Sequence, residues 1–238
     1  MTNIHQKNKK PTVRICGDCH GLTENYVDDV KDSRCEYSLQ IGDMGFHYED
    51  LEELDSDKHK FLGGNHDNYD VYHVCPHGLG DFGSRSVGEL DFYFIRGAFS
   101  IDWKDRFIRE RDTGKKSWWN EEQLNKEQQE AALSDYKKQR PSVMITHTCP
   151  TSIAKIIGSP GILTSWGYDA DSFNTDTQQL LQDCHEAHRP DVWIFGHFHR
   201  TIDFQHNGTR FMCLGELRAI EYDGKFHNEN KLDRVTQS

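Results

Sequence analysis

Five short apolar runs in this sequence are each followed at once by side chains that can bind metal ions. The segments that follow them are Asp18-Cys19-His20, Asp43, Asn65-His66-Asp67, His147 and His197-Phe198-His199. Where two ligands stand two residues apart in an extended chain, both side chains point to the same side and can share one ion. Imidazole and carboxylate together suit Mn, Fe, Zn or Ni, whereas an all-oxygen shell would suit Mg or Ca. The pattern therefore predicts a site for divalent transition metals.

The apolar runs themselves are predicted to be strands of an α/β domain, at residues 13–16, 37–41, 61–62, 143–145 and 192–195. Helical composition lies between them at 24–31, 48–58, 120–138 and 175–188, with Asn120 as the expected N-cap of the third helix. Two late strands, at 210–214 and 217–222, are expected to form a hairpin around Gly215. Ligand sites of open α/β sheets gather beyond the carboxyl ends of strands, so the five segments should meet there.

Length and composition favour one domain over residues 11–225, with polar ends at 1–10 and 226–238. No apolar run approaches 18 residues, so no membrane span is expected. The first ten residues are polar and basic, which argues against a secretory signal and leads us to expect a cytoplasmic protein with free thiols at its seven cysteines. The pair His185 and His188 lacks the spacing of a zinc-protease helix and is interpreted as part of a polar helix face.

The net charge of −11 disfavours a protein that holds nucleic acid through Lys and Arg. It leaves phosphate chemistry open, because bound divalent cations supply positive charge locally.

In order, the five segments resemble the motifs of the calcineurin-like metallophosphoesterase superfamily. The matching stretches are Gly17-Asp18-Cys19-His20-Gly21, Gly42-Asp43, Gly64-Asn65-His66-Asp67, Thr146-His147 and Gly196-His197-Phe198-His199, which together span residues 17–199. The resemblance implies a four-layer αββα sandwich with two mixed sheets and two divalent metal ions at the strand ends, Mn being the first choice ahead of Fe, Zn or Ni.

The resemblance also implies roles for these residues. One metal would be held by Asp18, His20, Asp43 and His199, and the other by Asp43, Asn65, His147 and His197, so that Asp43 bridges them. His66 would be a catalytic residue that binds no metal and that protonates the leaving oxygen or binds a phosphoryl oxygen. Two such cations can lower the pKa of a shared water for in-line attack on phosphorus.

Two stretches bear on the substrate. The protein-phosphatase branch has an aspartate and a phosphate-binding arginine where this chain has Phe46 and His47, which leaves the partner of His66 unidentified. A narrower branch, found among bacterial and phage proteins, is similar to this chain over Arg96-Gly97-Ala98-Phe99-Ser100-Ile101-Asp102 and Trp118-Trp119-Asn120-Glu121-Glu122. Arg96, Arg106 and His47 are the candidates for contacting substrate phosphate.

These observations predict a dinuclear metal-dependent phosphoesterase in which a metal-bridging hydroxide attacks a phosphate monoester. The expected substrate is a phosphorylated small molecule or a phosphoprotein. A phosphodiesterase acting on cyclic nucleotides or nucleic acid is the alternative, and a scaffold that has lost catalysis is the rival from another class. The oligomeric state stays open.

Overall fold

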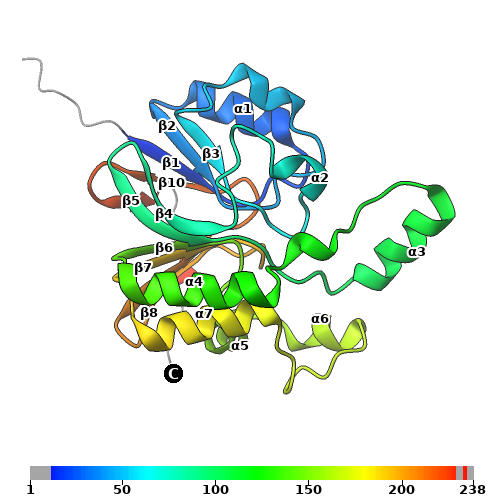
Figure 1. Cartoon of the computed structure of the whole chain (residues 1–238). Coiled ribbons are helices and arrows are strands. Elements are labelled where there is room, and N and C mark those ends of the chain that lie inside the picture. Colours follow the sequence, from blue (N-terminus) through cyan, green and yellow to red (C-terminus); the bar gives the residue numbers. More distant parts are fainter. Residues whose placement is uncertain (1–11, 229–232, 235–238) are drawn as a thin grey trace, which may run out of the picture.

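The computed structural model describes residues 12–228 and 233–234. Two mixed β-sheets pack face to face in it, and helices cover the outer face of each (Figure 1). The architecture is thus a four-layer αββα sandwich, as the resemblance to metallophosphoesterases implies. No helix within the described ranges is both long and apolar enough to cross a membrane.

The first sheet has the order β11-β10-β1-β2-β3. Strands β1, β2 and β3 run parallel, and β10 and β11 complete the sheet with antiparallel pairings. The bounds are β1 Val13–Cys16, β2 Tyr37–Gln40, β3 His59–Phe61, β10 Ala219–Tyr222 and β11 Phe226–Asn228. Its outer face carries α1 (Thr23–Asp32), the short 3-10 helix η1 (Glu49–Glu53) and α2 (Tyr69–Tyr72).

The second sheet has the order β12-β8-β9-β7-β6-β5-β4, and β5, β6, β7 and β9 run parallel in it. The strand bounds are β4 Phe82–Val87, β5 Leu90–Ile95, β6 Val143–Thr146, β7 Val192–Phe195, β8 Ile202–His206, β9 Thr209–Cys213 and β12 Asp233–Arg234. Helices α4 (Lys126–Gln139), α5 (Thr151–Ile157) and α7 (Asp176–Ala187) cover its outer face (Figure 1). Helices α3 (Trp103–Thr113) and α6 (Pro160–Ser165), with η2 (Asn120–Glu122), lie to one side.

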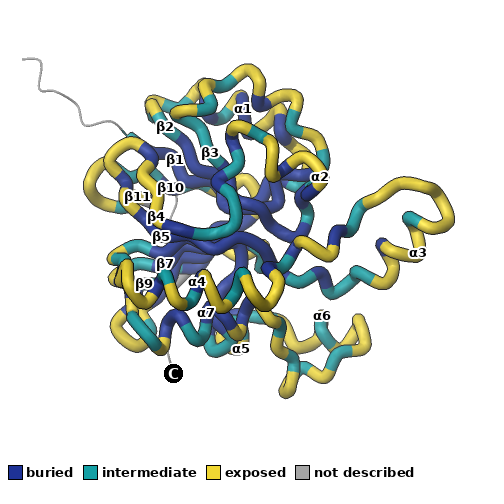
Figure 2. The backbone as a smooth tube through the Cα atoms, in the orientation of Figure 1, coloured by how far each residue is buried: buried dark blue, intermediate teal, exposed yellow. Residues whose placement is uncertain are grey.

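Alternation along the strands builds two of the three core clusters. In β5, Phe92 and Phe94 point between the two sheets, whereas Tyr93 and Ile95 point to the outer helices. Successive side chains of a strand face opposite sides, so a strand buried on both faces supplies both layers. The strands are accordingly buried along most of their length (Figure 2).

The expected hairpin around Gly215 does not form. Strand β9 pairs with β7 and β8, whereas β10 pairs with β1 in the other sheet. The chain crosses between the sheets at this point, where the Gly17 amide donates to the Arg218 carbonyl over 2.8 Å. The two strand-like runs are therefore correctly predicted as strands but wrongly predicted as partners, because β9 pairs with β7 and β8 of its own sheet whereas β10 pairs with β1 and β11 of the other.

Two helix expectations are also corrected. The helix expected at 120–138 starts at Lys126, and its N-cap is Asn125, which forms a capping box with Gln128. The expected cap Asn120 instead begins η2. Within 48–58 only Glu49–Glu53 is helical, as a 3-10 turn.

The ends of the chain differ in part from expectation. Residues 226–228 and 233–234, expected in a polar tail, form strands β11 and β12. The expected tail at 1–10, and the remainder of 229–238, lie outside the described residues.

Candidate metal centre

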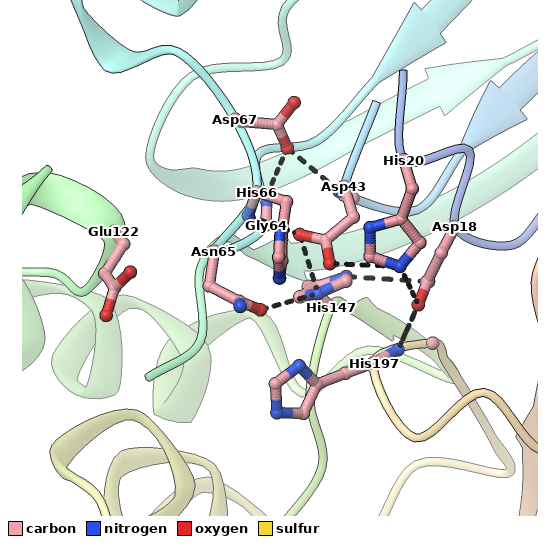
Figure 3. Close-up of polar contacts among 12 residues, drawn as sticks. Asp18, His20, Asp43, Gly64, Asn65, His66, Asp67, Glu122, His147 and His197 are labelled. Carbon is pink, nitrogen blue, oxygen red and sulfur yellow. Dashed lines mark hydrogen bonds and ion pairs between the residues drawn. The ribbon is translucent and has the colours of Figure 1, made fainter. Parts of the chain in front are cut away.

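Five loops bring the sequence-predicted ligands together beyond the carboxyl ends of five parallel strands. The loops follow β1, β2 and β3 of one sheet and β6 and β7 of the other. Figure 3 shows their Asp, Asn and His side chains converging between the two sheets. The site therefore depends on the packing of both sheets against each other.

One group of potential ligands consists of Asp18, His20 and His199, which offer ligand atoms within 4.8 Å of one another. The Oδ2 atom of Asp18 lies 3.5 Å from His199 Nε2 and 3.8 Å from His20 Nε2. His20 Nε2 also lies 3.8 Å from Asp43 Oδ2, which joins this group to its neighbour. These four residues are the set that the resemblance assigns to the first metal.

A second group consists of Asp43, His147 and His197, again with ligand atoms within 4.8 Å. His147 Nε2 lies 3.1 Å from Asp43 Oδ1 and 3.2 Å from Asn65 Oδ1 (Figure 3). Asp43 thus faces both groups, with one carboxylate oxygen toward each. A carboxylate in this position is suited to bridge two cations.

His66 belongs to a third grouping, with His20 and Asp43. The rings of His66 and His20 meet edge to face, with their centroids 4.8 Å apart. His66 therefore lies at the edge of the centre, beside both groups of ligands.

The backbone is held in an uncommon conformation at four candidate ligands. His20, Asp43, His197 and His199 have φ values of 49°, 59°, 68° and 51°, in the left-handed region. They are four of the seven non-glycine residues with positive φ in the described part of the chain. Such backbone costs on the order of 1–3 kcal/mol per residue and persists only where the surroundings impose it, typically at functional sites.

Glycines beside the ligands allow this close packing. A Cβ atom on Gly64 would collide with Asp43 Oδ1, and one on Gly196 would collide with Asp18 Oδ1. Gly42, with φ of 106°, leaves room for the His147 ring. Gly42, Gly64 and Gly196 are therefore required by the space that the neighbouring ligand fills.

Asp67 fixes two of the ligand loops, a role that the sequence analysis missed. Its buried carboxylate accepts hydrogen bonds from the backbone amides of Asp43 (2.9 Å), Gly64 (2.6 Å) and Gly45 (3.2 Å), and from the Tyr48 hydroxyl (3.1 Å). Burial, reinforced by the charge of Asp43, raises the pKa of Asp67 to about 7. The only sequence signal was its place directly after Asn65-His66.

The electrostatics suit bound cations. Burial raises the pKa of Asp18 to about 7 and lowers the pKa of His197 to about 3. Burial alone would raise the pKa of Asp43, but the charge and hydrogen bond of His147 lower it well below its usual range. Burial would lower the pKa of His147, but the charge of Asp43 raises it to about 9, so a bound ion would displace the proton of this ring, since neutral imidazole is the form that binds metal. Buried carboxylates are costly unless they are paired, and a bound cation would take over that pairing. Two carboxylates, four imidazoles and one amide oxygen thus fit a pair of divalent ions.

Arg106 is the partner of His66 that the sequence left unidentified. Its Nη2 atom lies 2.5 Å from His66 Nε2 and 3.1 Å from Nδ1, and its Nε donates to Asp102 Oδ2 over 2.8 Å. Burial, together with the positive charge of Arg106, lowers the pKa of His66 to about 4. Since a guanidinium only donates, the ring nitrogen that it contacts must be unprotonated. Arg106 thereby orients the imidazole from an element 40 residues away.

The other two candidates for phosphate contact lie elsewhere. Arg96 is 1% exposed, its Nε donates to Asp81 over 2.7 Å, and its guanidinium lies over the Tyr69 ring. The ring of His47 is 86% exposed and lies 3.9 Å from the Glu49 carboxylate. Arg96 is thus engaged within the fold, and His47 points into solvent outside the centre.

A buried relay orients Asn65. Its Nδ2 donates to the Ser100 hydroxyl over 3.2 Å, which in turn donates to Glu122 Oε2 over 2.7 Å. The Ser100 amide also donates to Glu122, over 2.7 Å. Burial raises the pKa of Glu122 to about 7. With its amide nitrogen held in this way, Asn65 presents its oxygen to the ligand group.

Known proteins that are similar to this chain are found among solved structures. No protein-family model and no curated protein matches the sequence. Similar solved structures include a phosphopantetheinyl hydrolase from Mycobacterium tuberculosis, with 14% identity over 87% of this chain and 90% of that chain, and a TM-score of 0.49. A putative 5'-nucleotidase from Staphylococcus aureus has 13% identity over 92% of this chain and 52% of that chain, with a TM-score of 0.47.

A third similar structure is a predicted phosphoesterase from Streptococcus pneumoniae, with 12% identity over 91% of this chain and 86% of that chain, and a TM-score of 0.39. Because all three TM-scores are below 0.5, support for a function comes from the residues of the site itself.

Proposed function

We propose that the chain is a metal-dependent phosphoesterase that hydrolyses phosphate monoesters and holds two divalent ions, Mn first among them. One observation carries the proposal. Two groups of ligand atoms, each drawn from distant loops, share the single carboxylate of Asp43. When bound there, two divalent ions would acidify a water molecule and neutralise charge on a phosphoryl group.

The chain's own residues would complete the site. Asp18, His20, His199 and Asp43 would hold one ion, and Asp43, Asn65, His147 and His197 the other. His66, beside both groups, would hydrogen-bond a phosphoryl or leaving oxygen of the substrate. Arg106 would keep the His66 ring in place, and Asp67 would keep the loops of Asp43 and Asn65 in register.

Matched aryl esters test the proposal. The protein is stripped with a chelator, reloaded with Mn²⁺ and assayed with 4-nitrophenyl phosphate and with bis(4-nitrophenyl) phosphate. We expect metal-dependent hydrolysis with the higher kcat/KM for the monoester. Preference for the diester would instead assign the site to a phosphodiesterase.

The bridging position supplies the matched variants. Asp43→Ala should abolish turnover and lower the bound metal found by elemental analysis, whereas Asp57→Ala, at an exposed loop position, should change neither. Purified protein that binds no Mn, Fe, Zn or Ni and hydrolyses neither ester would overturn the proposal.

A further inference from the structure

The candidate metal centre opens into a cavity of about 650 Å³. Asp43, Asn65, His66, His197 and His199 line one side of it. Cavities of roughly 300–1,000 Å³ accommodate whole small-molecule ligands, and a phosphate group occupies only a small part of such a volume. The rest of the cavity must therefore receive the group to which the phosphate is esterified.

The far side of the cavity is mainly apolar. Its wall is formed by the loop after β5, by α5 and by the segment 158–175, which includes α6 (Figure 1). The ring of Phe198 connects this wall to the centre, because it also packs against the His197 ring with the centroids 5.2 Å apart. The side chains that matter here are Phe99, Ile101, Ile162, Leu163, Trp166 and Phe198.

Two of these apolar side chains are left open to solvent. Ile162 is 54% exposed and Trp166 is 43% exposed, and α6 has no buried residue (Figure 2). Large apolar groups that line a concave site beside reactive residues gain free energy when an apolar ligand covers them. Their exposure is explained by a ligand with apolar surface.

The wall is anchored to the rest of the site. The Tyr168 hydroxyl donates to the Ile101 carbonyl over 3.1 Å. The Tyr168 ring packs on Phe99 and Phe173, at centroid distances of 6.1 and 4.9 Å. The apolar surface therefore has a set position relative to Ser100, the neighbour of Phe99 in the Asn65 relay.

Two exposed cationic side chains on this wall each donate a hydrogen bond to a backbone carbonyl. Arg200 Nη1 donates to the Ile157 carbonyl over 2.6 Å, and Lys155 Nζ donates to the Asp171 carbonyl over 3.3 Å. A substrate with a second anionic group would need cations that are directed at it. These two side chains are directed at backbone carbonyls, and the apolar side chains are the part of the wall that the organic group of a substrate would contact.

We propose that the substrate is a small-molecule phosphate monoester whose alcohol is bulky, uncharged and apolar, with an aromatic ring seated between Phe198 and the wall that carries Ile162 and Trp166. This inference rests on the proposed phosphoesterase function and specifies its substrate class.

Phenyl phosphate and biphenyl-4-yl phosphate test it with the Mn²⁺-loaded protein. Their leaving groups have similar acidity, so the chemical step is matched and the second ring is the main difference. Burying one further ring is worth about tenfold to a hundredfold in affinity. We expect kcat/KM to be higher by that factor for the biphenylyl ester, chiefly through a lower KM.

Variants assign the effect to the wall. Ile162→Ser and Trp166→Ala should each reduce the preference for the biphenylyl ester severalfold. Ile156→Ser is the matched control, because Ile156 is 42% exposed on α5 and does not line the cavity; it should leave the preference as it is. Both wall positions are exposed, so folding should be retained, which circular dichroism would verify.

The outcomes separate the two proposals. Hydrolysis of both esters with equal kcat/KM would overturn the substrate class and leave the phosphoesterase function standing. A preference that persists in both wall variants would also overturn it, since the second ring would then bind elsewhere. Failure to hydrolyse either ester with any of the four metals would overturn the phosphoesterase function itself.

Discussion

The Nη2 atom of Arg106 lies 2.5 Å from Nε2 of His66. Arg106 is buried, on the first turns of α3, and its Nε is paired with Asp102. The contact with Asp102 thus positions the guanidinium, and the contact with His66 positions the imidazole. A residue that the sequence offered as a phosphate ligand is, in the structure, a contact of the histidine beside the candidate metal centre.

Replacing Arg106 should separate these two roles. In Arg106→Lys the charge remains and the fork of donors is lost, so His66 is no longer oriented. We expect kcat to fall about tenfold to a hundredfold with KM little changed. Steady-state kinetics with 4-nitrophenyl phosphate measures both, and Arg109→Lys, exposed on the same helix, is the control. A large rise in KM at constant kcat would instead show that Arg106 binds substrate phosphate.

His66→Ala should leave metal binding intact. Turnover should fall by up to about 10²–10⁴-fold for esters of poor leaving groups, because a hydrogen bond to the leaving oxygen matters most there. The loss should be smaller for 4-nitrophenyl phosphate. Elemental analysis of the variant checks the metal content. Since His66 is grouped with His20 and Asp43, loss of metal from the variant would make His66 a ligand.

Asp67→Asn should destabilise the folded protein. The Asp67 carboxylate accepts from three backbone amides, and an amide in its place would direct a donor at one or more of them. Leaving a buried donor unpaired costs about 1–3 kcal/mol, so we expect a loss of about 3 kcal/mol in the free energy of unfolding. Urea denaturation measures it. Asp57→Asn, at an exposed turn position, should change stability by less than about 0.5 kcal/mol.

Ser100→Ala should weaken metal binding without removing a ligand. Without the hydroxyl, the Asn65 amide nitrogen loses its hydrogen bond to Ser100, and the side chain can turn its nitrogen toward a bound metal. Loss of such an outer contact typically costs 10–100-fold in metal affinity. Competition with a chelator for Mn²⁺ measures the change, and Ser100→Thr, which keeps the hydroxyl, should restore most of the affinity. Equal affinity in Ser100→Ala and the parent would show that the relay does not orient Asn65.

His185, which lies outside the candidate metal centre, should make the free energy of unfolding depend on pH. It is buried between Trp193 and Phe211, with Nε2 3.2 Å from the Thr209 hydroxyl, and so does not lie on a polar helix face. Burial, with the charges of Arg189 and His206 acting in the same direction, lowers its pKa from 6.5 to about 4.

Between pH 4 and 6.5 the unfolded chain therefore binds a proton at His185 that the folded chain does not. Stability attributable to this group should be full above pH 6.5 and be lost as the pH falls to 4, by at most about 3 kcal/mol. Urea denaturation across this range should show a shallower pH dependence for His185→Gln than for the parent. Parallel dependences would contradict the prediction.

Much of the fold, and the residues that come together in the candidate metal centre, could be predicted because their signals are local. A buried strand is an apolar run, and a ligand at its carboxyl end is the next residue along the chain. The strand at 192–195, the loop of His197 and the glycines before Asp43 and Asn65 are all visible in this way. The order of these short segments then carried the resemblance to metallophosphoesterases.

The partners of those residues were decided by tertiary structure alone. Arg106 meets His66 across 40 residues, and Ser100 meets Asn65 across 35. Strands β9 and β10 are adjacent in the chain but belong to different sheets. Local periodicity records which face of a strand or helix is apolar, but it does not record which distant surface will cover that face. The side chains that can bind metal or substrate are therefore recognisable in the sequence. The contacts that orient these side chains exist only in the folded protein, where the two sheets pack together.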